Sequence, residues 1–224
     1  VLGAPLATHL LITARIEGTD GLSLFLVDSD APGIQTHPYR TIDDRSAADI
    51  AFDGLRLAGT ALLGEPGGAW PSVARARDEG AAAICAEAVG CMRKVLADTV
   101  EYCKQRQQFG QPIGNFQLIQ LKLAKMEVAR MNLQNLVFRH IEMSAAGVGM
   151  SFAEASAAKL YAAQAATDVA LEAVQLFGGN GYMAEYEVEQ LARDAKVLQI
   201  YAGTDEIQVS AVARSLLADH AAKN

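Results

Sequence analysis

The sequence of 224 residues contains no apolar run approaching the roughly 18 residues that a membrane-spanning helix needs. Positive charge is scarce, because 19 Lys and Arg stand against 26 Asp and Glu, a formal net charge of −7. Nucleic-acid-binding proteins usually carry a basic patch, so this balance argues against one. The N-terminal residues lack the charged and apolar regions of a signal peptide. We therefore expect a cytoplasmic protein with no membrane span and no nucleic-acid partner.

Cysteine is also rare. Cys85, Cys91 and Cys103 form no CxxC pair, and we expect buried free thiols in a reducing compartment. The histidines are scattered without metal-ligand spacing, so no metal site is expected. Neither GxGxxG after a strand nor GxSxG occurs. These absences exclude a Rossmann-type dinucleotide site and the nucleophile of an α/β-hydrolase.

The first 66 residues have the pattern of a β domain. Short apolar runs at 9–15 and 22–27 flank the turn-like segment 17–21, which predicts a hairpin. A further strand is expected at 49–57. Gly and Pro at 65–68 end this part of the chain.

Helical periodicity dominates from residue 67 onward. Ser151 with Glu154 three positions later is a capping box, and Asn115 is a second candidate cap. The expected helices are 70–107, 115–147, 151–177, 184–196 and 204–219. Long alanine-rich helices with short connections are typical of an up-down bundle. The expected fold class is α+β, a partial antiparallel β domain followed by an up-down four-helix bundle.

Arg106-Gln-Gln-Phe109-Gly110 is the first segment that could carry chemistry. The planar fork of an arginine can pair with a phosphate, and an aromatic ring nearby can cover a flat cofactor ring. The alternative is a simple helix end, with the arginine in the last turn and Gly110 at the C′ position.

Two further segments follow, Gln175-Leu-Phe-Gly-Gly-Asn-Gly-Tyr182 and Tyr201-Ala-Gly-Thr-Asp-Glu-Ile-Gln208. Consecutive glycines let a ligand approach the backbone, whose N–H groups can face a phosphate. The alternative for this segment is a helix–turn–helix loop that needs positive φ. In the second segment, Thr204 also fits a helix N-cap.

In this order and spacing, the three segments resemble the acyl-CoA dehydrogenase family of flavoenzymes, and the resemblance covers essentially the whole chain. It implies that residues 1–66 are the second half of the family's middle β domain. Residues 67–224 would be its C-terminal α-helical bundle, which takes part in FAD and acyl-CoA binding and in oligomerisation. We expect a longer protein, of which this stretch alone binds FAD weakly.

The resemblance also implies an activity. The reaction is FAD-dependent α,β-dehydrogenation of an acyl-CoA thioester to trans-2-enoyl-CoA, in fatty acid metabolism. An electron-transfer flavoprotein reoxidises the FAD. The implied assembly is a homotetramer, or a heterotetramer with another acyl-CoA dehydrogenase subunit.

Site residues follow from the same resemblance. The implied cofactor-binding residues are Arg106, Gln108, Phe109, Gln175, Gly178, Gly179, Thr204 and Glu206. Those up to Gly179 would contact the FAD of a neighbouring subunit. The implied substrate-binding residues are Asp78, Tyr201, Ala202 and Gly203.

The catalytic base departs from the family pattern. Many members carry the catalytic Glu at the position of Ala202, and others carry it on the first bundle helix, at the position of Gly80. Glu79 is one residue away and is our candidate base, although one residue rotates a helix position by about 100°. A π-bulge could correct this offset. The alternatives are a solvent-facing Glu79, with Asp205 or Glu206 as the base.

Lack of a carboxylate at both usual positions leaves two other functions open. The chain could be a base-lacking subunit that completes the FAD site of a heteromeric acyl-CoA dehydrogenase. It could also be a flavin-dependent oxidase or monooxygenase built on the same scaffold.

Overall fold

The chain divides into two compact units, Val1–Arg77 and Asp78–Asn224. The computed structural model describes residues 1–221. The first long helix runs through the point of division, from Trp70 to Gln105. The domain boundary expected between residues 66 and 67 stays a prediction.

The first unit consists of antiparallel β-structure. Its strands are β1 (His9–Ala14), β2 (Ser23–Asp28), β3 (Ile34–Arg40), β4 (Ser46–Phe52) and β5 (Leu62–Leu63), with short 3₁₀ helices η1 (Ala4–Leu6) and η2 (Gly59–Ala61). One sheet has the order β1-β2-β5, and β3 pairs with β4 separately. The expected first hairpin is confirmed, since β1 pairs antiparallel with β2 from His9 opposite Asp28 to Ala14 opposite Ser23.

Two strand predictions need correction. The strand expected at 49–57 begins earlier and ends at Phe52, shortly before Gly54 takes a φ of 63° that breaks the extended backbone. Strand β3 was not expected. It is exposed along almost its whole length and contains Pro38, so its sequence carries no apolar alternation.

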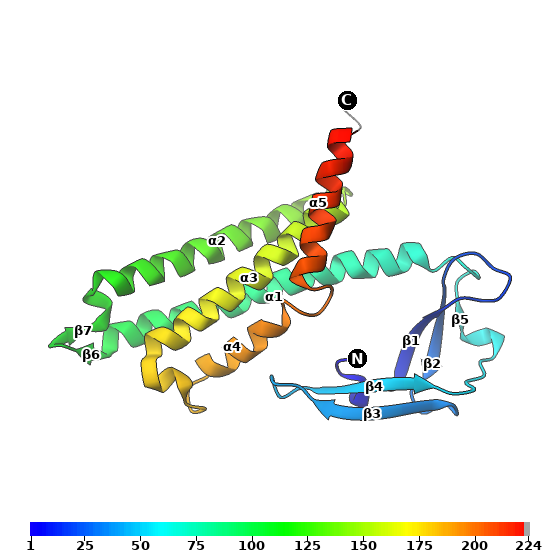
Figure 1. Cartoon of the computed structure of the whole chain (residues 1–224), viewed down its shortest axis with the longest axis horizontal. Coiled ribbons are helices and arrows are strands. Elements are labelled where there is room, and N and C mark those ends of the chain that lie inside the picture. Colours follow the sequence, from blue (N-terminus) through cyan, green and yellow to red (C-terminus); the bar gives the residue numbers. More distant parts are fainter. Residues whose placement is uncertain (222–224) are drawn as a thin grey trace. The chain divides into compact units, whose positions relative to one another are not determined.

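The second unit is the helical bundle shown in Figure 1. Its helices are α1 (Trp70–Gln105), α2 (Gln117–Ala145), α3 (Phe152–Phe177), α4 (Val188–Val197) and α5 (Asp205–Ala221), with 3₁₀ helices η3 (Ile113–Asn115) and η4 (Gly178–Tyr182) and the two-residue strands β6 (Gln107–Gln108) and β7 (Gln111–Pro112). Helices α1, α2 and α3 run alongside one another, α4 lies along α3, and α5 crosses it. The expected α+β class is confirmed.

Helix starts were predicted with mixed success. The capping box of α3 is present, with the Glu154 N–H donating to Ser151 Oγ at 3.2 Å and the Ser151 N–H donating to Glu154 Oε2 at 3.0 Å. The assignment of Asn115 as the cap of α2 is wrong. Asn115 ends η3, and Phe116 precedes α2 without a side-chain cap bond.

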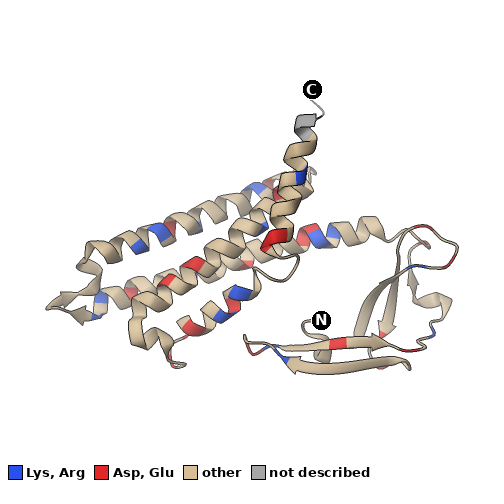
Figure 2. Cartoon of the chain, in the orientation of Figure 1, with Lys and Arg blue, Asp and Glu red and all other residues tan. Residues whose placement is uncertain are grey.

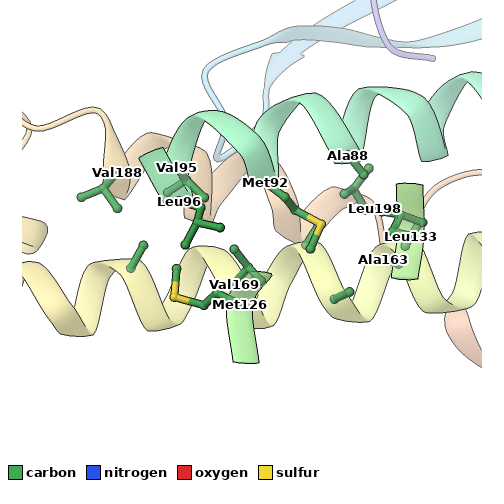
Figure 3. Close-up of a cluster of buried hydrophobic side chains, with 14 of the residues drawn as sticks. Ala88, Met92, Val95, Leu96, Met126, Leu133, Ala163, Val169, Val188 and Leu198 are labelled. Atoms are coloured by element: carbon green, nitrogen blue, oxygen red, sulfur yellow. The ribbon is translucent and has the colours of Figure 1, made fainter. Parts of the chain in front are cut away.

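The bundle core forms where α1 and α2 pack against α3. Met92, Val95 and Leu96 project from α1 with helical spacing toward Val169 of α3, as Figure 3 shows. Helix α3 is buried on most of its surface, largely through alanines, so neighbouring helices approach it closely. Both basic and acidic residues occur along the bundle helices in Figure 2.

None of the helices within residues 1–221 is long and apolar enough to cross a membrane.

Candidate functional site

A tight hairpin follows helix α1 and presents Phe109. Gln107 pairs with Pro112 and Gln108 with Gln111, which leaves Phe109 and Gly110 as the two turn residues. Both have positive φ, 52° and 81°, the pattern of a type I′ turn. Gly110 therefore does not cap α1, which corrects the helix-end alternative.

The tip of this hairpin is open to a ligand. The Phe109 side chain is 92% exposed, an unusual state for a phenylalanine. Arg106, immediately after α1, is exposed as well, and its carbonyl oxygen accepts from the Ile113 N–H at 2.8 Å. An exposed aromatic ring and an exposed guanidinium are thus held on one short, hydrogen-bonded turn.

The second glycine segment forms the turn after α3. Gly178 has a φ of 61°, and a β-carbon built on Gly178 or Gly179 would meet no atom within 4 Å. Gly181 differs, because a β-carbon there would lie 2.4 Å from the Val174 carbonyl oxygen. Gly181 lets the turn pack on α3, whereas Gly178 and Gly179 leave an open backbone that a ligand can approach.

Tyr102 fixes this turn to α1. Its hydroxyl donates to the Phe177 carbonyl oxygen and accepts from Asn180 Nδ2, both at 3.1 Å. Its ring stacks on Phe177 with centroids 4.1 Å apart. The sequence alone does not single out Tyr102, since an aromatic residue within a helix gives the same signal as ordinary core packing. The hairpin after α1 and the glycine turn after α3 consequently lie at one end of the bundle.

The third segment forms the loop between α4 and α5. Ala202 and Gly203 both have positive φ, 52° and 92°. The Gln208 Nε2 donates to the carbonyl oxygens of Ala202 and Gly203, at 3.0 and 3.2 Å. The φ of 92° disfavours any other residue at Gly203, and a β-carbon there would also lie 2.7 Å from the Gln208 nitrogen and displace that side chain. Thr204 directly precedes α5, and its hydroxyl hydrogen-bonds to Glu206, which lowers the pKa of that carboxyl.

Lys159 lies beneath this loop. Its side chain is 1% exposed, and its Nζ donates to the Gly203 carbonyl oxygen at 2.7 Å. Asp205 Oδ1 is 3.8 Å from the same nitrogen. Burial lowers the pKa of Lys159, while Asp205 and Cys85 act in the opposite direction. The sequence alone does not single out Lys159, because a lysine in a helix is normally a surface residue.

The predicted cofactor residues fall into two groups rather than one. The first group lies where α3 ends at Phe177, and the second surrounds Lys159 near the start of α3. These two residues are 18 positions apart, and at about 1.5 Å per residue the groups are about 27 Å apart along α3. The expectation that the first group contacts the cofactor of another subunit stays a prediction.

Asp78 and Glu79, near the start of α1, lie on the same half of the bundle as Lys159. Asp78 lines an apolar cavity of about 210 Å³ together with Cys85 and Ala158. Glu79 is exposed. Helix α1 is α-helical without interruption, so the π-bulge considered as a correction for Glu79 is not present in this helix.

The cysteines differ in exposure. Cys85 and Cys103 are buried as expected, but Cys91 is exposed, so that expectation is wrong for Cys91. Burial raises the pKa of the Cys85 thiol to about 11. Residues 1–221 contain no cluster of three or more His, Cys, Asp or Glu side chains that could hold a metal ion.

Comparison with known proteins identifies the family. The family model described as "Acyl-CoA dehydrogenase, C-terminal domain" matches residues 68–217. The chain is 37% identical over 209 residues to an acyl-CoA dehydrogenase of Bacillus subtilis, covering 92% of the chain and 55% of that protein. The chain therefore belongs to the acyl-CoA dehydrogenase family.

Solved structures also superimpose closely on this chain. Butyryl-CoA dehydrogenase from Megasphaera elsdenii superimposes with a TM-score of 0.87 at 33% identity, over 96% of this chain and 58% of that one. The prolyl acyl carrier protein oxidase AnaB gives a TM-score of 0.89 at 29% identity, over 96% of this chain and 58% of that one. The chain thus spans a little over half the length of these relatives.

Proposed function

We propose that this chain forms the C-terminal part of an FAD-dependent acyl-CoA dehydrogenase that converts an acyl-CoA thioester to a trans-2-enoyl-CoA. The observation that carries the proposal is the match of the family's C-terminal domain to residues 68–217. The similarity to butyryl-CoA dehydrogenase supports an acyl-CoA as the substrate class. The proposed partners are an electron-transfer flavoprotein and further dehydrogenase subunits, as a homotetramer or heterotetramer, in cytoplasmic fatty acid metabolism.

The residues of this chain fit an FAD in their exposure and chemistry. The guanidinium of Arg106 would pair with a phosphate, with Gln108 as a hydrogen-bonding neighbour, and the exposed ring of Phe109 would cover a flat ring system. Gln175 is exposed in the last turn of α3, just before the open backbone of Gly178 and Gly179. In the proposed assembly these residues complete the FAD site of a neighbouring subunit.

The loop around Lys159 would belong to the chain's own FAD and substrate. Thr204 and Glu206 would contact the cofactor, and Tyr201, Ala202, Gly203 and Asp78 would contact the acyl-CoA. FAD, when bound, supplies the hydride acceptor of the reaction. The loop orients the thioester and keeps water from the reacting carbons, while a carboxylate removes the α-proton.

We propose Glu79 as that carboxylate. Cys85 of α1 and Ala158 of α3, the neighbour of Lys159, line the same cavity, which supports a site for this part of α1 near the loop. Glu79 precedes Cys85 by six residues, about 9 Å along the helix axis and about 120° around it, and its side chain is exposed to a ligand. Asp205 is a weaker candidate, because its side chain is largely buried and faces the Lys159 ammonium.

Anaerobic mixing of the full-length, FAD-loaded protein with a panel of acyl-CoAs tests both the reaction and the base. We expect loss of oxidised-flavin absorbance with at least one acyl-CoA, and a decrease of about 10²- to 10⁴-fold in its rate in Glu79→Gln. Glu87→Gln is the matched control, an exposed glutamate on the same helix. Equal rates in wild type and Glu79→Gln would move the base to another carboxylate, and no flavin reduction with any acyl-CoA would contradict the proposed reaction.

Two observations favour alternative functions. Ala202 and Gly80 provide no carboxylate, which supports a base-lacking subunit whose Arg106 and Gly179 complete a partner's FAD site. Co-purification of a second, base-containing dehydrogenase polypeptide would favour that reading. The likeness to AnaB, which is described as an oxidase, supports flavin-dependent oxidation on the same scaffold. Substrate-dependent consumption of O₂ without an electron-transfer flavoprotein would favour it.

A further inference from the structure

Lys159 is a charged group that the proposed reaction does not use directly. It is among the largest fully buried side chains in the described part of the chain. A buried ammonium is costly unless it is paired and hydrogen-bonded. The two groups that compensate it, the Gly203 carbonyl oxygen at 2.7 Å and the Asp205 carboxylate at 3.8 Å, both belong to the junction of the α4–α5 loop with α5.

The loop above Lys159 has an uncommon backbone conformation. Ala202 has a φ of 52°, which a residue with a β-carbon adopts only when its surroundings impose it. Here the surroundings are hydrogen bonds to the carbonyl groups of Ala202 and Gly203. Gln208 donates to the carbonyl oxygens of Ala202 and Gly203, and Lys159 donates to Gly203 from the opposite helix.

We infer that Lys159 is a positioning residue for the proposed dehydrogenation, which it serves by holding the Tyr201–Thr204 loop through the carbonyl group of Gly203. The inference rests on the proposed function for its kinetic consequence. Lys159 reaches the loop from α3, below the backbone, so it acts through the loop rather than on the substrate. Without Lys159, Gln208 is the side chain that still donates to the carbonyl groups of Ala202 and Gly203, and we expect Ala202 to relax toward negative φ.

The Lys159 ammonium contributes N–H donors and a positive charge as well as volume. A methionine has a similar length and would occupy the same volume, but it has no N–H to donate to the Gly203 carbonyl oxygen. It would also leave Asp205 without its counter-charge in a largely buried position, where only 15% of its side chain is exposed. The start of α5 and the loop are therefore both bound to α3 through one nitrogen.

The first test compares Lys159→Met with Lys122→Met in the full-length, FAD-loaded protein. Lys122 pairs with Glu172, so its replacement removes an ion pair between α2 and α3 without touching the loop. For Lys159→Met we expect the rate of flavin reduction at saturating acyl-CoA to decrease about 10- to 100-fold with FAD content retained, since small misplacements of reacting groups have effects of this size. Lys122→Met should stay within about 2-fold of wild type, because this pair is partly exposed and does not contact the loop.

Chemical rescue separates the ammonium from a general structural effect. In Lys159→Ala, n-propylammonium should restore part of the lost rate, because it replaces the missing chain and its N–H donors. Tetramethylammonium has the same charge and no N–H, and it should not restore the rate. An unchanged rate in Lys159→Met, or equal rescue by both ions, would overturn the inference.

Two measurements keep the inference testable if the lysine variants do not fold or the reaction is not found. Gln208→Met removes the other donor to the same carbonyls and should give the same pattern, a lower rate with FAD retained, whereas a wild-type rate would contradict the role of this loop. Hydrogen exchange of the amides of residues 201–206 should become faster in Lys159→Met even if no acyl-CoA reduces the flavin. Unchanged exchange there would refute the positioning role independently of the reaction.

Discussion

Replacement of Tyr102 by phenylalanine should loosen the glycine turn after α3 while the aromatic packing remains. The hydroxyl makes two hydrogen bonds of 3.1 Å, to the Phe177 carbonyl oxygen and from Asn180 Nδ2. The stacking of the ring on Phe177 does not depend on it. Each partly buried hydrogen bond contributes about 0.5–1.5 kcal/mol net, so their loss should lower the free energy of unfolding by about 1–3 kcal/mol.

Urea and thermal denaturation monitored by circular dichroism measure this loss. For a domain of this size, each kcal/mol shifts the midpoint by roughly 2–4 °C. Tyr161→Phe is the matched control, because the Tyr161 hydroxyl makes a single long bond of 3.4 Å to the Ala129 carbonyl oxygen. That loss should be below about 0.5 kcal/mol, since the bond is at the limit of useful geometry.

The same variant should bind FAD more weakly in the full-length protein, because Tyr102 holds the turn that carries Gly178 and Gly179. The fraction of protein purified with FAD provides this readout. The reasoning would be refuted if Tyr102→Phe and Tyr161→Phe lost equal stability. It would also be refuted if Tyr102→Phe destabilised the turn and kept full FAD content, since the turn would then have no part in cofactor binding.

Two further predictions concern local structure. Ser151→Ala should cost about 1 kcal/mol of unfolding free energy, because it removes the N-cap of α3. Hydrogen bonds from Ser151 lower the folded-state pKa of Glu154, so this carboxylate stabilises the fold above its unfolded pKa. The stabilisation is lost as pH falls through the depressed folded pKa. The unfolding free energy should therefore depend less on pH in Ser151→Ala than in wild type. Gly181→Ala should destabilise the bundle because its β-carbon would lie 2.4 Å from the Val174 carbonyl oxygen, whereas Gly179→Ala meets open space and should change stability little; equal losses in denaturation would contradict this difference.

Local signals in the sequence predicted much of the helical unit. The Ser151–Glu154 box fixes the start of α3, and its hydrogen bonds involve only neighbours in the chain. The β1–β2 hairpin was predicted from two apolar runs and the turn between them. Such features depend on residues within a few positions of each other, and the local chain therefore encodes them.

Predictions failed where the local signal was weak or ambiguous. Asn115 is a good cap residue by type, but it is the last residue of η3, and α2 starts two residues later. Gly110 fits a helix C-terminus in sequence, yet pairing of Gln107 with Pro112 uses it in a hairpin instead. Strand β3 is exposed almost throughout, so no buried face imposed a pattern on it.

The sequence by itself determined the α+β class, the order of most elements and the segments that resemble a flavoenzyme family. Only the tertiary structure decided which of those segments lie together. Packing of α1 against α3 brings Tyr102 to Phe177, 75 residues later in the chain, and α3 carries Lys159 to Gly203, 44 residues later. Contacts between residues so far apart leave no periodic trace in the sequence, because their geometry is set by how the helices pack.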